Sequence, residues 1–177
     1  MPVSLNMDMV GQVEMNDRIT GFVLKQSDYR EADVILTVLT KEYGKLSFVA
    51  QGVRKMTSKN AGSIMPYTKT EILFDYNETK TIFRLKSARC KEYYRSMHED
   101  IAASSAAAVA AELINVLTLQ ASSDMTNSDE YAFLDIVFSK LDEGYDPTLV
   151  LSLLFVDMLE LAGLLPDVDA CVICGNT

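Results

Sequence analysis

The sequence predicts an α+β protein in which a small closed β-barrel precedes an α-helical bundle. Two observations carry this prediction. Five short runs rich in β-branched, aromatic and other apolar residues follow one another over about residues 18–88, with turn-forming residues between them. From Ser96 onward the apolar residues recur with the period of a helix. We therefore expect a flexible leader over residues 1–17, a barrel domain over 18–95 and a helical domain over 96–177.

The β-type runs are 18–26, 33–40, 45–51, 67–75 and 79–88. Lys41–Gly44 predicts a tight hairpin between the second and third runs, and Asp75–Glu78 predicts another between the fourth and fifth. One long polar loop, Gly52–Gly62, separates the third run from the fourth. Five short strands within about 70 residues favour a closed barrel over a sandwich.

Three helices are expected over about residues 96–163. Ser96 and Glu99 have the spacing of a capping box, and an alanine-rich helix would run behind them to about Gln120. The apolar residues of a second helix recur from Tyr131 to Leu141. Asp146 and Pro147 are typical of the start of a third helix, which is apolar almost all round and is therefore expected at the centre of the bundle.

Charge is distributed very unevenly along the chain. The net charge is −9, yet residues 1–95 hold 15 of the 16 lysines and arginines and 11 of the 25 acids, whereas the remaining residues hold one base and 14 acids. Such an asymmetry indicates a basic binding face beside a separate acidic body. The absence of a signal-like segment and the odd number of cysteines, three, favour a cytoplasmic protein.

The basic residues cluster where a β-barrel could bind a strand of nucleic acid. Binding of single strands needs cations along the phosphates and aromatic faces for the bases, and Tyr43, Tyr67, Tyr93 and Tyr94 offer such faces. The alternative is a solvated barrel surface that carries ordinary lysines. The DNA-binding candidates are Lys25, Lys45, Arg54, Lys55, Lys59, Arg84 and Lys86.

Several kinds of catalysis lack their residues. The single histidine, His98, argues against a catalytic triad, and neither a phosphate-binding GxxxxGK[ST] loop nor a GxGxxG is present. Cys171 and Cys174 form a CxxC, which supplies two of the four ligands that zinc commonly takes. We therefore expect no enzyme, no catalytic residues and an incomplete zinc site in this chain.

Three segments together resemble the RecO family of DNA repair proteins, over about residues 18–177. These are the opening at 19–33, the hairpin at 39–46 with the segment 50–55 that follows it, and the end at 162–175 with its CxxC. The resemblance implies an OB-fold barrel followed by a helical domain that in many members carries zinc. Here the second CxxC and several tens of residues of the usual length are missing.

The resemblance also implies a function. RecO proteins bind single- and double-stranded DNA, anneal complementary strands, contact RecR and the acidic tail of single-strand binding protein, and so help to load RecA. Two other hypotheses stay open beside this one. The acidic helical domain could serve as a non-catalytic scaffold for other proteins, or the CxxC could serve a redox or metal enzyme.

Overall fold

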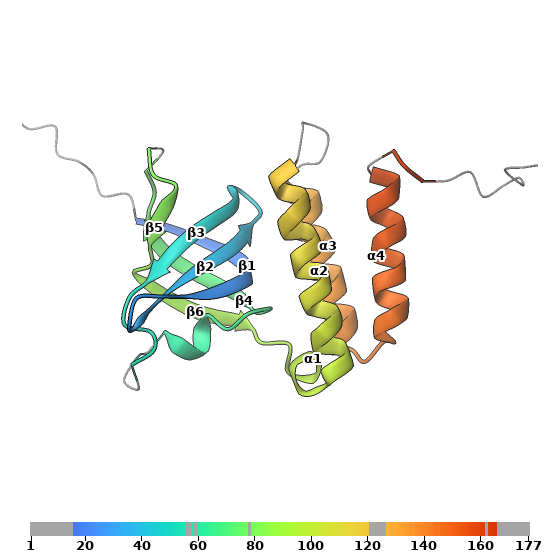
Figure 1. Ribbon diagram of the computed structural model, residues 1–177, viewed down its shortest axis with the longest axis horizontal. Helices are drawn as coiled ribbons and strands as arrows, with labels where there is room; N and C mark the ends of the chain where they lie inside the picture. The colour runs from blue at the N-terminus through green and yellow to red at the C-terminus, as the bar shows by residue number, and fades with distance from the viewer. Residues whose placement is uncertain are drawn as a thin grey trace, which may run out of the picture.

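The structure is a computed structural model that describes residues 16–55, 58, 60–77, 79–120, 127–161 and 163–165. A curled, mixed six-stranded sheet forms the first half and a group of helices stands beside it (Figure 1). This OB-like barrel with its helical domain confirms the predicted α+β class. None of the helices in the described ranges is long and apolar enough to span a membrane.

The sheet is built around one long strand. Strand β1 (Asn16–Tyr29) pairs antiparallel with β2 (Asp33–Thr40) along one edge and with β4 (Lys69–Asp75) along the other. Strand β3 (Gly44–Ala50) continues the meander beyond β2. The full order is β5-β3-β2-β1-β4-β6, with β5 (Ile82–Arg84) and β6 (Ser87–Glu92) at the two edges. At Gly21 the backbone of β2 comes so close that a Cβ would meet a Val38 methyl at 2.5 Å, so only glycine fits there.

The run predicted as one fifth strand forms two strands that bond to opposite edges of the sheet. Strand β5 (Ile82–Arg84) is parallel to β3, and β6 (Ser87–Glu92) is antiparallel to β4. The exchange happens within two residues: the Leu85 N–H donates to the Val49 carbonyl at 3.0 Å, and the Lys86 N–H donates to the Leu73 carbonyl at 2.9 Å. The predicted count of five was therefore wrong, because a β-rich run does not reveal which edge each residue bonds.

The helices are α1 (Arg95–Glu99), α2 (Ile101–Gln120), α3 (Asn127–Asp142) and α4 (Pro147–Leu161). The predicted capping box at Ser96 was wrong. The first helix is a short turn, and Asp100 starts the long one by accepting a hydrogen bond from the Ala103 N–H at 2.7 Å. The predicted cap at Asp146 is confirmed by its bond from the Leu149 N–H at 2.9 Å.

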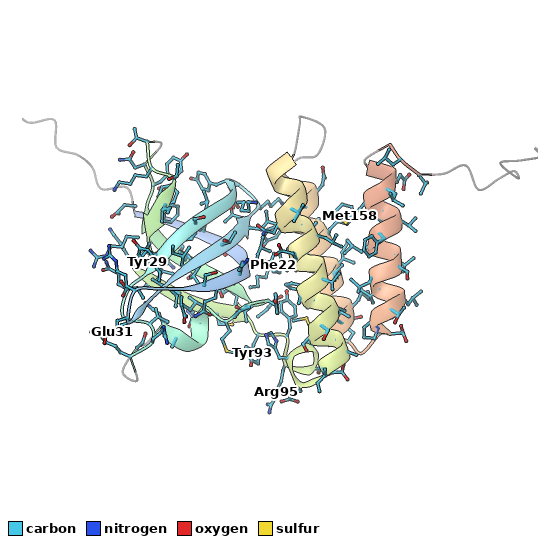
Figure 2. All side chains as sticks on the ribbon, in the orientation of Figure 1. Phe22, Tyr29, Glu31, Tyr93, Arg95 and Met158 are labelled. Carbon is cyan, nitrogen blue, oxygen red and sulfur yellow. The ribbon has the colours of Figure 1, made fainter. Side chains whose placement is uncertain are left out.

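Two apolar cores stabilise the protein. The first fills the barrel around Phe48, Phe74 and Phe83, whose rings contact one another. The second lies between the barrel and the helices, where Phe22 points from β1 into the bundle (Figure 2) and meets Phe138 edge to face at 5.5 Å. The strands also contribute Leu24 and Leu39 to this second core.

Helix α4 lies at the edge of the described bundle and not at its centre (Figure 1). It buries Val150, Leu154 and Met158 against the second core, whereas Leu149 and Leu153 are more than half exposed. The prediction of a central helix was wrong for the described residues, because all-round apolarity shows what a helix can bury and not what covers it.

Candidate nucleic-acid interface

The outer face of β1, β2, β3 and β5 carries two rows of side chains that cross the sheet. The register places Lys25 beside Thr37, Thr37 beside Ser47, and Ser47 beside Ile82. The next row runs from Ser27 through Ile35 and Val49 to Arg84. Since neighbouring strands lie about 4.8 Å apart, each row spans roughly 14 Å. In OB-folds this face, with the loops at its ends, binds oligonucleotides and oligosaccharides.

One end of this face is hollowed into a groove of about 270 Å³, which we call the basic groove. One side comes from the end of β1 and the β1–β2 turn, the other from β5 and the residues before it, and β3 lies between them. None of the described residues that line it is acidic. They are Tyr29, Arg30, Val49, Gln51, Lys80, Ile82, Phe83 and Arg84.

Arg30 is held at the groove by an unusual backbone. It adopts φ = 60° in the turn between β1 and β2, a left-handed conformation that costs an ordinary residue about 1–2 kcal/mol. Its guanidinium lies over the Tyr29 ring, 5.0 Å from the centroid. Cation and ring therefore share the rim of the groove. Backbone strain of this kind is concentrated at functional sites.

The segment after β3 is bound to the same turn. The Gly52 N–H donates to the Asp33 carboxylate at 2.8 Å, and the Arg54 N–H donates to the Ala32 carbonyl at 3.1 Å. The Arg54 guanidinium pairs with the Asp28 carboxylate at 3.0 Å, but both side chains are well exposed. Such a pair contributes little stability, and a guanidinium with five N–H donors retains several for a phosphate.

The structure brings four of the predicted DNA-binding residues to this end of the barrel. Lys25 and Arg84 lie on the outer face, and both are exposed. Arg54 and Lys55 follow on the exposed segment beside the β1–β2 turn. That these residues contact DNA stays a prediction. Lys59 lies outside the described residues.

Two predicted residues lie elsewhere. The Lys86 ammonium pairs with the Asp75 carboxylate, on the β4 side of the barrel. The Lys45 ammonium donates to the Asn115 backbone carbonyl at 2.8 Å, in the contact between barrel and helices. Burial lowers the pKa of Lys45, and the nearby Glu130 and Glu112 charges only partly oppose that effect. We therefore leave Lys45 and Lys86 out of the proposed interface.

Sequence reasoning missed Arg30 and Lys80, which both line the basic groove. A usable signal existed, because OB-folds bind through the loop between their first two strands and the loop before the closing strand. Arg30 and Lys80 lie in those two loops.

The four tyrosines singled out for stacking do not face the groove. Tyr94 is buried, with only 7% of its surface exposed, so that prediction was wrong for this residue. Tyr67 meets Phe138 at 6.3 Å in the second core. Tyr43 and Tyr93 contact Tyr76 and His98, respectively. Tyr29 is instead the aromatic side chain at the groove.

The acidic helices stand away from the basic groove. Figure 2 shows Tyr29 and Glu31 at one end of the barrel and Phe22 at the opposite end, next to the helices. Charges separated by more than about 8 Å are largely screened at physiological salt. The charges of the helices therefore act only weakly at this end, where the cations of the groove lie near the exposed acids Asp28 and Glu31.

The two cysteines predicted as zinc ligands, Cys171 and Cys174, lie outside the described residues. Within the described part, no three histidine, cysteine or acidic side chains come together in a way that could hold a metal ion. Cys90 is half-buried in β6, and burial raises the pKa of its thiol. A raised pKa disfavours the reactive thiolate.

The chain thus combines an OB-like barrel, a basic groove on the face where OB-folds bind oligonucleotides and oligosaccharides, and a helical domain. Two family models match the chain, one for each half. The model described as "Recombination protein O N terminal" matches residues 15–94, and "Recombination protein O C terminal" matches residues 98–177. The chain belongs to the RecO family.

Curated relatives agree with the family models. The chain is 30% identical over 161 residues to a protein named DNA repair protein RecO from Listeria welshimeri, covering 91% of this chain and 61% of that protein. It is 28% identical over 162 residues to a DNA repair protein RecO from Ligilactobacillus salivarius, covering 92% of this chain and 62% of the relative. The chain thus spans about three fifths of the length of these relatives.

Proposed function

We propose that this chain is a non-catalytic DNA-binding module of recombinational repair, which binds the sugar–phosphate backbone with the cations around the basic groove. The observation that carries the proposal is the set of three cations, Arg30, Lys80 and Arg84, around a groove on the ligand-binding face of an OB-like barrel. Lys25, Arg54 and Lys55 would extend the contact along the strand. Membership of the RecO family supports the same function.

Binding of this kind needs no chemical step. Cations that contact phosphates release condensed counterions, so the affinity arises with little regard to sequence and falls as salt rises. A protein that holds a strand by its backbone leaves base edges accessible to a complementary strand. We therefore propose that the chain binds single- and double-stranded DNA and takes part in annealing.

The family also suggests partners and a metal. We propose that RecR and the tail of single-strand binding protein contact this protein in the cytoplasm, and that RecA loading follows indirectly. Zinc would use Cys171 and Cys174, and two thiolates are half of the usual ligand set. These proposals rest on the family alone.

A second candidate function, a scaffold for other proteins, is favoured by helix α4. Its exposed apolar side chains face a groove of about 300 Å³ between α3 and α4, lined by Ile136, Leu149 and Leu153 among others. Apolar patches of this kind often mark protein contacts. A scaffold would not need the barrel cations, and this difference separates the two functions.

The test is titration of a single-stranded oligonucleotide with the wild-type chain and with the double variant Arg30→Ala, Arg84→Ala. Each single-strand phosphate contact contributes about 0.7 to the slope of log affinity against log salt. We expect the double variant to bind more weakly and to lose about one unit of slope. Equal weakening of all sequences is expected as well.

The matched control is the double variant Arg95→Ala, Lys140→Ala. It removes the same two charges from exposed or half-exposed ion pairs in the helical half, with Glu99 and Glu143. A groove that binds DNA predicts a much smaller effect of this control. Equal affinities for wild type and both double variants would contradict DNA binding in the groove and favour the scaffold.

A further inference from the structure

The basic groove contains apolar surface that phosphate binding does not require. Ile82 is 46% exposed on the outer face of β5, although it is a large aliphatic residue. Tyr29, across the groove, is 36% exposed, and Val49 lies between them on β3. Contact with phosphates alone would be served by cations and polar residues. The apolar surface therefore indicates a second kind of contact inside the groove.

The arrangement suits one unpaired nucleobase. A base has two apolar faces and polar edges, and it gains most when its face lies on an aromatic or aliphatic side chain. The groove has a volume of about 270 Å³. The Gln51 amide lines the same space and can both donate and accept hydrogen bonds, as a base edge requires.

Cations lie on both sides of this apolar surface, so they could contact the phosphates on either side of a bound base. Arg30 and Tyr29 share one rim, and Lys80 and Arg84 stand with Ile82 on the other. A strand that crosses the groove would have phosphates at the rims and a base between them. A duplex cannot fill the space in this way, since its bases are stacked and paired within the helix.

We propose that Tyr29 and Ile82 form a site for one unpaired base within the basic groove, which makes the chain prefer single strands to duplex. This inference rests on the proposed function and assigns it a specificity determinant. Tyr29 would contact the base with the ring face that Arg30 does not cover. Ile82 and Val49 would support the base from the sheet.

The experiment measures fluorescence anisotropy of the full chain with three labelled probes of about 16 nucleotides, the upper site size of one OB-fold. The probes are an oligothymidine strand, an abasic strand of the same length, and a duplex. The variants are Tyr29→Ala and Ile82→Ala. We expect each to weaken binding of the oligothymidine strand about tenfold and to change abasic and duplex binding little.

Tyr145→Ala is the matched control. Tyr145 is also an exposed tyrosine with a cation over its ring, Lys140 at 4.7 Å, but it lies in the helical half. We expect its replacement to leave all three affinities unchanged. Tyr29→Phe should keep the preference for single strands, since it keeps the ring.

The experiment distinguishes failure of the base site from failure of the proposed DNA-binding function. If Arg30→Ala, Arg84→Ala weakens all three probes but Tyr29→Ala and Ile82→Ala leave the ratio of oligothymidine to abasic affinity unchanged, the base site is wrong and DNA binding stands. If the arginine variant changes no probe, the groove is not the DNA interface and the proposed function fails with it. Equal loss for all three probes with Tyr29→Ala would also overturn the base site.

Discussion

The Lys69 ammonium donates a hydrogen bond to the Asp135 carboxylate at 2.9 Å, and this bond joins β4 of the barrel to α3 of the bundle. The same ammonium lies over the Phe22 ring, 5.5 Å from its centroid. Burial lowers the pKa of Lys69, but its hydrogen bond to Asp135 and the charges around it outweigh that effect and raise the pKa above its usual value. Lys69 is therefore charged throughout the physiological range and links both halves.

Replacement of Lys69 by Met should lower the free energy of unfolding by about 1–3 kcal/mol, because it leaves the Asp135 carboxylate without its charged partner. Chemical denaturation measures the change. Lys140→Met is the control, since its pair with Glu143 is on the surface and should contribute less than about 1 kcal/mol. Equal losses of unfolding free energy in the two variants would show that the Lys69 bond stabilises the protein no more than a surface ion pair does.

Gly21→Ala should destabilise the barrel by about 1–3 kcal/mol through overpacking. The new Cβ would lie 2.5 Å from the Val38 Cγ1 atom and 2.6 Å from the Leu39 carbonyl oxygen, so β1 and β2 must separate. Gly62→Ala, where a Cβ meets nothing within 4 Å, is the control. Thermal unfolding should give a lower Tm only for the first variant.

Glu130→Gln should stabilise the protein by about 1–2 kcal/mol at pH 7. Glu130 is 2% exposed, and its Oε2 atom has no hydrogen-bond partner among the described residues. Burial raises the pKa of this carboxyl, and the Lys45 charge opposes the shift only in part. The variant also loses the attraction to Lys45, which is the smaller of the two effects.

The sign of the pH dependence follows from the raised pKa of Glu130. A carboxyl with a higher pKa in the folded state lowers stability as pH rises from its unfolded value, about 4.3, through the folded one. The advantage of Gln over Glu should therefore grow as pH rises above the unfolded value and vanish below about pH 4. Denaturation at several pH values measures it. An advantage that stayed constant down to about pH 3 would contradict this origin.

Asp28→Ala should strengthen binding of single-stranded DNA severalfold. It removes an acid from the end of the barrel that carries the basic groove and releases the Arg54 guanidinium from its 3.0 Å pair. Each phosphate that the released guanidinium then binds would steepen the salt dependence by up to about 0.7. Glu99→Ala is the control, because it removes the same charge from an exposed pair with Arg95 in the helical half. Affinity unchanged in Asp28→Ala would show that Arg54 takes no part.

The sequence predicted the class and order of the elements because alternating and helical periods are local properties. It did not predict the partition of residues 82–92 between two edges, since hydrogen-bond partners far away along the chain leave no local pattern. Likewise, the residues around Lys45 do not predict its hydrogen bond to Asn115, which lies 70 residues further along the chain. The place of Arg30 beside Lys80 and Arg84 also depends on the pairing of β3 with β5, which is not a local property.

The exchange of partners at Leu85 and Lys86 means that the barrel cannot close before this stretch is made. The β1–β2–β3 meander contains only contacts between neighbours along the chain and can form early. The last bonds of the barrel join residues 82–92 to strands made much earlier, and they wait until that stretch has left the ribosome. Until then the edges of β3 and β4 are open to other chains. The helices that follow β6 then cover Phe22 and Leu39, the apolar side chains that the closed barrel still presents.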